Sequence, residues 1–173
     1  MKKYEFTGET KTVQFLFENV TLHRIQAITS FENVVAGELG GWIEKEENLS
    51  QGGNAWVGGN AWVGDNARVD GNAQVGGNAQ VSGNAWVRGN AQVCGDARVF
   101  SINHILTIGV IGSRDDFTTF YRDKDNEITV KCGCFSGKID KFLEKVAQTH
   151  GDSKYAQVYK KAVELAKLQI LTG

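Results

Sequence analysis

The stretch GNAWVGGNAWVGDNARVDGNAQV, residues 53–75, decides the fold because it repeats the pattern Gly-Asn-Ala-x-Val-x every six residues. The pattern recurs eight times and ends at Phe100. Ala and Val are two residues apart, so on a strand they point to one face and the residue between them points to the other. Gly and Asn tolerate positive φ angles, so each Gly-Asn step predicts a turn. A short strand and a turn at constant period predict a solenoid lined with Ala and Val.

This hexad resembles the left-handed parallel β-helix of the hexapeptide-repeat superfamily. The resemblance implies three hexads per triangular coil, so that residues 18 apart stack, and Asn side chains at the corners form hydrogen-bonded columns. The segment from Gly41 keeps the period, which places Ile43 and Leu49 in the Ala slot. The sequence therefore predicts a mainly β fold: a short left-handed parallel β-helix of about three coils over 41–100, an N-terminal β cap over 1–40 and a small C-terminal α+β domain over 101–173.

The flanking segments predict the elements that close the open strand edges of a solenoid. Short alternating strands are expected before residue 40. After Phe100 we expect a buried strand over 105–111 and a hairpin formed by 117–121 and 127–132. Two amphipathic helices should follow, the first capped by Ser136 and the second by Asp152.

The outward slot between Ala and Val holds residues of opposite character. In order it holds Trp56, Trp62, Arg68, Gln74, Gln80, Trp86, Gln92 and Arg98. Gln and Arg suit a solvated face, whereas a tryptophan there exposes a large apolar ring. Three interpretations are open: the N-terminal segment covers the rings, a subunit interface buries them, or they form a platform that stacks on a ligand. The resemblance implies a trimer packed side by side along the prisms. The predicted interface and binding residues are Trp56, Trp62, Trp86, Arg68, Arg98, Arg114 and Tyr121.

Catalytic motifs are sparse. Many hexapeptide-repeat proteins are acyltransferases with a histidine base, and of His23, His104 and His150 only His104 lies just past the last coil. The resemblance also includes zinc hydratases, which need clustered histidines on the coil, and no histidine lies between residues 24 and 103. Cys132 and Cys134 are more simply explained as alternating residues of a strand than as a metal site. We expect no metal and no cofactor.

Composition narrows the partners. A net charge of −1 over 173 residues favours neither nucleic acid nor an anionic membrane as a partner, and no stretch is apolar enough to span a bilayer.

Residues 1–100 resemble hexapeptide-repeat proteins of phages and prophages, which implies that the protein acts in the cytoplasm of a host bacterium. The leading hypothesis is a non-enzymatic, oligomeric binding protein or inhibitor. Its C-terminal domain would recognise a host protein, such as a defence protein, or its nucleotide signal. The alternatives are an acyltransferase-like enzyme with His104 as base and a structural part of a virion.

Overall fold

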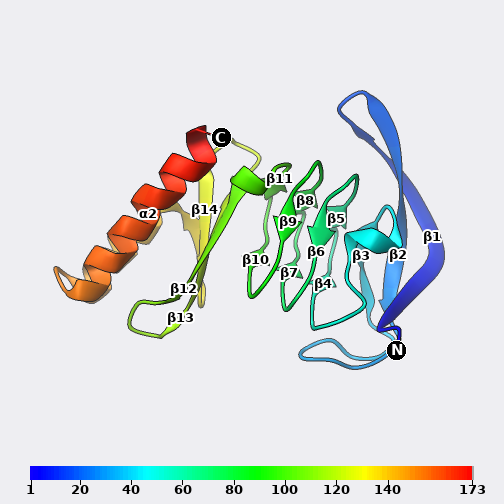
Figure 1. Ribbon diagram of the computed structural model, residues 1–173, viewed down its shortest axis with the longest axis horizontal. Coiled ribbons are helices and arrows are strands. Elements are labelled where there is room, and N and C mark those ends of the chain that lie inside the picture. The colour runs from blue at the N-terminus through cyan, green and yellow to red at the C-terminus, as the bar shows by residue number, and fades with distance from the viewer. Residues whose placement is uncertain (173) are drawn as a thin grey trace.

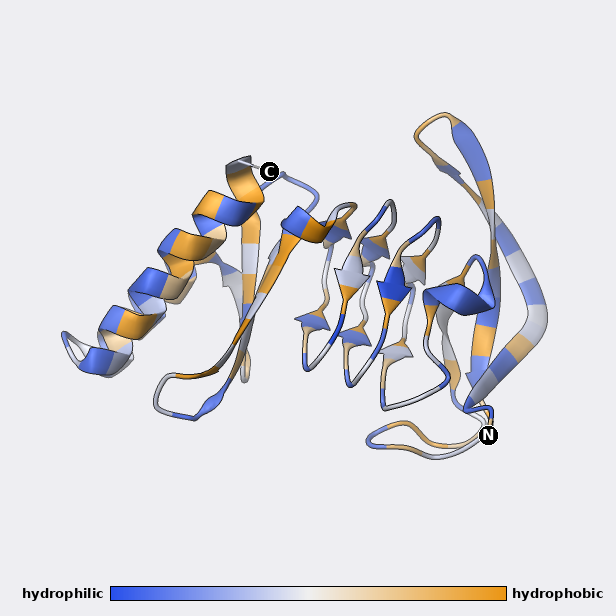
Figure 2. Cartoon of the chain, viewed as in Figure 1, coloured by the Kyte–Doolittle hydropathy of each residue, from blue (hydrophilic) through white to orange (hydrophobic). Residues whose placement is uncertain are grey.

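The computed structural model describes residues 1–172 and arranges them in three parts along one axis (Figure 1). A long N-terminal hairpin stands at one end, a β-solenoid forms the middle, and a small sheet covered by two helices forms the other end. Figure 2 shows polar and apolar residues alternating along the strands and on the long C-terminal helix. The predicted fold class is therefore confirmed as mainly β, with about three solenoid turns followed by an α+β region.

Eight two-residue strands form the solenoid. They are β4 (Trp56–Val57), β5 (Trp62–Val63), β6 (Arg68–Val69), β7 (Gln74–Val75), β8 (Gln80–Val81), β9 (Trp86–Val87), β10 (Gln92–Val93) and β11 (Arg98–Val99). Every third strand pairs in parallel, so the three faces are β4-β7-β10, β5-β8-β11 and β6-β9. Residues 18 apart are register partners, for example Trp56 with Gln74 and Arg68 with Trp86. The predicted stacking of the outward slots is confirmed.

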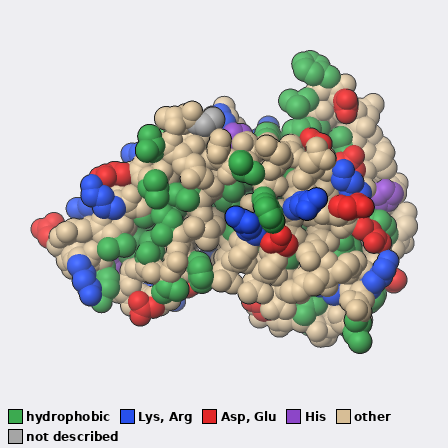
Figure 3. Space-filling model, in the orientation of Figure 1, with side chains coloured by type: hydrophobic (Ala, Val, Ile, Leu, Met, Phe, Trp, Pro, Cys, Tyr) green, Lys and Arg blue, Asp and Glu red, His purple; other side chains and the backbone are tan. Residues whose placement is uncertain are grey.

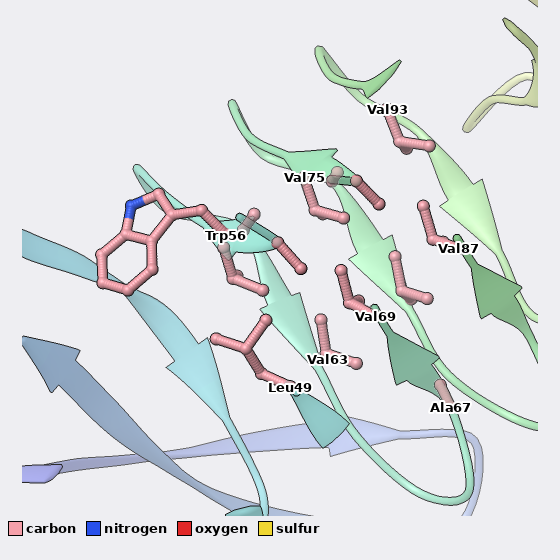
Figure 4. Close-up of a cluster of buried hydrophobic side chains, with 14 of the residues drawn as sticks. Leu49, Trp56, Val63, Ala67, Val69, Val75, Val87 and Val93 are labelled. Atoms are coloured by element: carbon pink, nitrogen blue, oxygen red, sulfur yellow. The ribbon is translucent and has the colours of Figure 1, made fainter. Parts of the chain in front are cut away.

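The interior of the solenoid is an apolar column of Ala and Val. Every Ala and Val of the eight repeats is buried, and these side chains form one cluster. Figure 4 shows Val63, Val69, Val75 and Val87 pointing toward one another from the facing walls, whereas the ring of Trp56 points away from them. The repeat therefore supplies a thin core, and the outward residues are free to differ.

Turns at the corners use glycine as the sequence predicts. The glycines of the Gly-Asn steps have positive φ, and Asp65 takes the same conformation in the one step that lacks glycine. At Gly83 an added Cβ would lie 2.1 Å from the carbonyl oxygen of Phe100, so no larger residue fits there. The predicted column of Asn54, Asn72 and Asn90 forms in part, since Asn72 donates to Asn90 at 3.1 Å. The predicted pair on the next corner forms, since Asn60 donates to Asn78 at 3.3 Å.

The phase predicted for the first coil is wrong by two residues. Ile43 is the register partner of Val63, and Leu49 forms a bridge with Val69, so both occupy the Val slot rather than the Ala slot. The corner 50–53 contains the two extra residues. Gly41 then takes the small inward slot, where a Cβ would lie 2.6 Å from the carbonyl oxygen of Ala61. A single turn of 3₁₀ helix, Glu46–Asn48, breaks the next hexad.

The N-terminal hairpin continues one solenoid face. β1 (Tyr4–Phe15) pairs with β2 (Glu18–Ala27), and β2 pairs antiparallel with β3 (Leu39–Ile43), which lies parallel to β5. Lys3 closes the end of the column: its Nζ donates to the carbonyl oxygens of Ala55 at 2.7 Å and Gly52 at 3.3 Å. The first edge of the solenoid is thus covered by chain that precedes the repeat.

The C-terminal sheet closes the other end. It consists of β12 (Ile105–Ile111), β13 (Asp116–Arg122), β14 (Ile128–Cys132) and β15 (Phe135–Lys138), in that order and antiparallel. A 3₁₀ turn, Ile102–His104, leads into it. The helices α1 (Ile139–His150) and α2 (Lys154–Thr172) pack on one face. The other face meets the last coil, where Thr119 Oγ1 accepts from the amide of Gln92 at 3.1 Å.

Four local predictions in this region are wrong. Asp152 lies in the turn before α2, and Ser153 is the residue that directly precedes the helix. Ser136 lies in β15 rather than at a helix N-cap, because the chain forms one more strand before α1 begins at Ile139. β12 is an edge strand that is only partly buried. Cys134 lies in the turn between β14 and β15, so alternation along one strand does not explain why it stands two residues after Cys132.

Candidate functional site

Two of the three outward tryptophans of the repeat are covered by the chain itself. Trp56 and Trp62 are 4% and 6% exposed. Phe15 of the hairpin packs edge-to-face on Trp62 with ring centroids 5.3 Å apart, and Phe31 does the same on Trp56 at 5.5 Å. The interpretation of these two rings as a subunit interface is therefore wrong, because the N-terminal segment already removes them from water.

Trp86 is the exception, with 41% of its surface exposed. It lies on the β6–β9 face beside Arg68, its register partner, which is also exposed. The indole Nε1 donates to the Asp70 carboxylate at 2.7 Å, and the Arg88 guanidinium lies 4.2 Å from the ring centroid. Figure 3 shows basic, acidic and hydrophobic side chains gathered at the centre of this side of the solenoid. We call Arg68, Asp70, Trp86 and Arg88 the Trp86 platform.

A groove of about 510 Å³ adjoins the platform, between the last coils and the C-terminal sheet. Its lining residues are Trp86, Arg88, Gly89, Asn90, Ala91, Ile102, Ile105, Leu106, Thr107, Phe117 and Gln169. A smaller and more polar hollow of about 300 Å³ shares Asn90 and Phe117 with it and adds Lys131. An apolar groove of this size beside an aromatic ring and a guanidinium has the composition of a site for an organic anion.

Sequence reasoning missed Asp70 and Arg88. Both directly follow the Val of a hexad, at a slot that holds Gly or Ser in four of the eight repeats, and they are 18 residues apart. Arg68 and Trp86 have the same separation. Reading both slots at the 18-residue spacing would have placed all four residues on one face. No sequence pattern indicates that Ile102 and Phe117 line the groove, because their positions depend on how the C-terminal sheet packs against the last coil.

The other predicted binding residues do not join the platform. Tyr121 is buried between β13 and the last coil, where its hydroxyl lies 3.5 Å from Cys94 Sγ. That burial raises the pKa of Tyr121 and contradicts its assignment to a binding surface. Arg98 is exposed on a different face, at the end of β5-β8-β11. Arg114 lies in the loop before β13, next to Gly133.

His104 is partly buried beside the last coil. Its Nδ1 accepts from the amide of Phe100 at 3.1 Å, and its Nε2 lies 2.9 Å from Arg122 Nη1. Burial and then the positive charge of Arg122 lower the pKa of His104, so the ring is neutral at pH 7. A neutral imidazole has one acceptor nitrogen, yet both nitrogens face N–H donors. Because Nδ1 accepts from Phe100, Nε2 carries the ring proton. To act as a general base at Nε2, His104 would have to release Arg122 and move that proton to Nδ1, which breaks the bond from the Phe100 amide.

No cluster of three or more metal-binding side chains occurs within residues 1–172. Cys132 Sγ accepts from Thr118 Oγ1 at 3.3 Å instead. No helix of the same residues is long and apolar enough to cross a membrane.

No family model matches the chain. The chain is 39% identical over 61 residues to a protein of Escherichia coli strain K12 named "Uncharacterized acetyltransferase YdcK". The match covers 33% of this chain and 19% of the relative, so the chain spans only part of that protein's length. The six-residue repeat, the three-faced solenoid and this similarity together fit the hexapeptide-repeat superfamily.

Proposed function

We propose that this protein binds a nucleotide-bearing acyl donor, such as an acyl-coenzyme A thioester, and transfers its acyl group. Trp86 carries the proposal. Within residues 1–172 it is the repeat tryptophan that keeps a substantial exposed surface, 41%, and Asp70 and Arg88 hold its ring in place. The similarity of part of the chain to an acetyltransferase favours this ligand class over others that also stack on tryptophan.

The platform and the groove suit different parts of such a donor. A purine stacks on an indole with about 1–3 kcal/mol per base. Guanidinium groups pair with phosphate oxygens through two parallel hydrogen bonds, and Arg68 and Arg88 flank the ring. The apolar walls at Ile102, Leu106 and Phe117 fit the flexible arm that links nucleotide and thioester.

Transfer requires a base that removes a proton from the acceptor. His104 has the required neutral imidazole, since burial and Arg122 lower its pKa. The Phe100 amide occupies the acceptor nitrogen Nδ1, and Arg122 faces Nε2. The acceptor must therefore displace the guanidinium, and the ring proton must move from Nε2 to Nδ1, before Nε2 can accept a proton. In this scheme the acceptor's nucleophilic atom attacks the thioester carbonyl, its proton passes to His104, and the thiolate leaves.

Binding is tested by titrating the protein with acetyl-coenzyme A and following tryptophan fluorescence. Trp42, Trp56 and Trp62 are at most 7% exposed, so quenching by a bound ligand reports on Trp86. Trp86→Gln and Arg88→Gln should each weaken binding at least tenfold, measured by calorimetry. Arg98→Gln, which removes an exposed arginine from the same slot on another face, is the matched control. Equal affinity in all four proteins would contradict the proposal.

A second candidate is a non-enzymatic, oligomeric binding protein with a host protein or a nucleotide as target. It is favoured by His104, both of whose nitrogens face donors of the same chain. Turnover separates the two. Acetyl transfer that is lost in His104→Gln while donor binding persists supports the enzyme, whereas donor binding without turnover over a panel of amine and hydroxyl acceptors supports the binding protein.

A further inference from the structure

The tip of the β1–β2 hairpin is unusually apolar for a turn in water. Leu16 and Phe17 form the two-residue loop between paired Phe15 and Glu18. Phe17 is 99% exposed and Leu16 is 75% exposed. Figure 3 shows hydrophobic side chains at the end of the hairpin, which projects from the body of the molecule. The folded chain thus gains almost nothing from these two side chains.

The turn itself disfavours these residues. Leu16 has a φ of 54°, in the left-handed region where a bulky side chain is strained. A hairpin loop with positive φ at its first central residue prefers Gly there and Asn, Asp or Ser next. Such strain persists mainly where surrounding contacts or another interaction hold the residue in place. Strain and exposure together indicate that the tip makes a contact outside its own chain.

The groove beside Trp86 is a receptor of matching character on the same molecule. It is about 510 Å³ in volume, with Trp86, Ile102, Leu106 and Phe117 in its walls. One leucine and one phenylalanine side chain fit such a volume. The tip cannot be the occupant within one chain, because it overhangs Glu44 and Asp65 of the first coils, whereas the groove lies at the last coils.

The charges of the two surfaces are complementary. The hollow beside the tip is lined by Glu18, Glu44 and Asp65 and by no basic side chain among the described residues. The one charged residue among those that line the groove is Arg88. On the same face Arg68 adds a second positive charge, and Asp70, whose carboxylate accepts from the Trp86 indole, adds one negative charge, so the surface keeps a net positive charge. An acidic tip that enters a basic, aromatic groove is attracted at long range and gains an ion pair on arrival.

We propose that the hairpin tip of one copy, Leu16 and Phe17, inserts into the Trp86 groove of a second copy, with Glu18 facing Arg88. The contact is heterologous, joining two different surfaces, so it produces a closed ring or an open chain of subunits. It differs from the side-by-side packing of prisms that the repeat alone suggests. This contact between copies does not depend on the proposed acyl donor. The hairpin tip and the donor would nevertheless occupy the same groove, so they should compete for it.

The test compares self-association of matched variants by analytical ultracentrifugation from micromolar to millimolar concentration. Leu16→Gly/Phe17→Asn gives the turn the residues it prefers, so the hairpin should stay folded while the apolar tip is lost. Trp86→Gln removes the receptor ring. Leu168→Asn, an exposed apolar residue on α2, is the control. Tip and groove variants should weaken association at least tenfold, and the control should match the parent.

Charge reversal provides an independent readout. Glu18→Lys and Arg88→Glu should each weaken association, and the double variant should regain it because the pair is restored with opposite signs. A parent that stays monomeric throughout, association unchanged in the tip variant, or no recovery in the double variant would overturn the proposal. The tip variant should still bind acetyl-coenzyme A, and failure of the parent to bind it would refute the proposed function alone.

Discussion

Trp62 and Trp86 occupy the same slot of the same repeat, and the molecule treats them in opposite ways. Trp62 lies under Phe15 with 6% of its surface exposed, whereas Trp86 is 41% exposed and holds only Asp70 and Arg88. The local backbone is the same, since both residues open a two-residue strand. The two faces differ in which flanking segment packs on them: the N-terminal hairpin covers Trp62, and it does not cover Trp86. The repeat determines which residues point outward, and the flanking segments determine which of them meet solvent.

The largest expected effect is a contrast in stability between Trp62→Gln and Trp86→Gln. Gln occupies this slot in three neighbouring repeats, so the solenoid backbone accepts it. Loss of the buried ring should lower the free energy of unfolding by about 3–5 kcal/mol, and loss of the exposed ring by less than about 1 kcal/mol. Equilibrium denaturation in urea, followed by circular dichroism, measures both. Equal losses would mean that the hairpin does not pack on Trp62 in solution.

The next effect concerns the covered end of the solenoid. Lys3 is 5% exposed, and burial lowers its pKa to about 8. Between about pH 8 and about pH 10 the folded chain loses this proton before the unfolded chain does, so stability should rise with pH, by about 2 kcal/mol. Burial and Arg24 also lower the pKa of Lys11, which adds in the same direction.

The control for this prediction is Lys3→Met, which has a similar length and no titrating group. The difference in stability between parent and variant should change with pH over this range, while the contribution of Lys11 cancels. Burial raises the pKa of Tyr4, which lowers stability only above the usual tyrosine range and so outside the window. A pH-independent difference would show that the carbonyl oxygens of Ala55 and Gly52 keep the ammonium charged.

A smaller effect follows from removing the cover instead of the ring. Phe15 contacts Trp62 and also Phe100, whose ring centroid lies 4.9 Å away. Because Phe15 is only partly buried, Phe15→Ala should cost about 1–2 kcal/mol, and acrylamide should then quench Trp62 as well as Trp86. Phe17→Ala, two residues away at the exposed tip, is the control and should change neither.

The sequence predicts the structure of the repeat more fully than it predicts how the flanking segments pack on it. The Ala and Val core, the outward slots and the 18-residue stacking follow from the hexad, since period fixes direction. The two extra residues at 50–53 could not be predicted from the sequence, because Ile43 and Leu49 are apolar and would suit either the Ala slot or the Val slot. The cover over Trp56 and Trp62 was one of several open interpretations. Only tertiary contacts decide among them, and the Trp86 groove likewise requires the C-terminal sheet in place.

The smallest effect tests whether the corners of the solenoid add stability independently of its faces. Asn78 accepts from Asn60 and donates to Asp96 at 3.2 Å, so Asn78→Ala breaks two bonds of one column. These bonds are exposed, and about 0.5 kcal/mol each is expected. Asn84, on the third corner, has no side-chain hydrogen bond within residues 1–172, and Asn84→Ala should cost less. The two variants should differ by about 1 kcal/mol in urea denaturation.

A second readout separates the ladder from a general loss at the corner. Lys124 and then Asn78 lower the pKa of Asp96 through hydrogen bonds to its carboxylate. Asn78→Ala should therefore raise the pKa of Asp96, as followed by NMR titration of the carboxyl group, and Asn84→Ala should leave it unchanged. Equal stability losses with no change in that pKa would mean that the stacked amides follow the coil rather than stabilise it, and that the Ala and Val column and its covers hold the solenoid together alone.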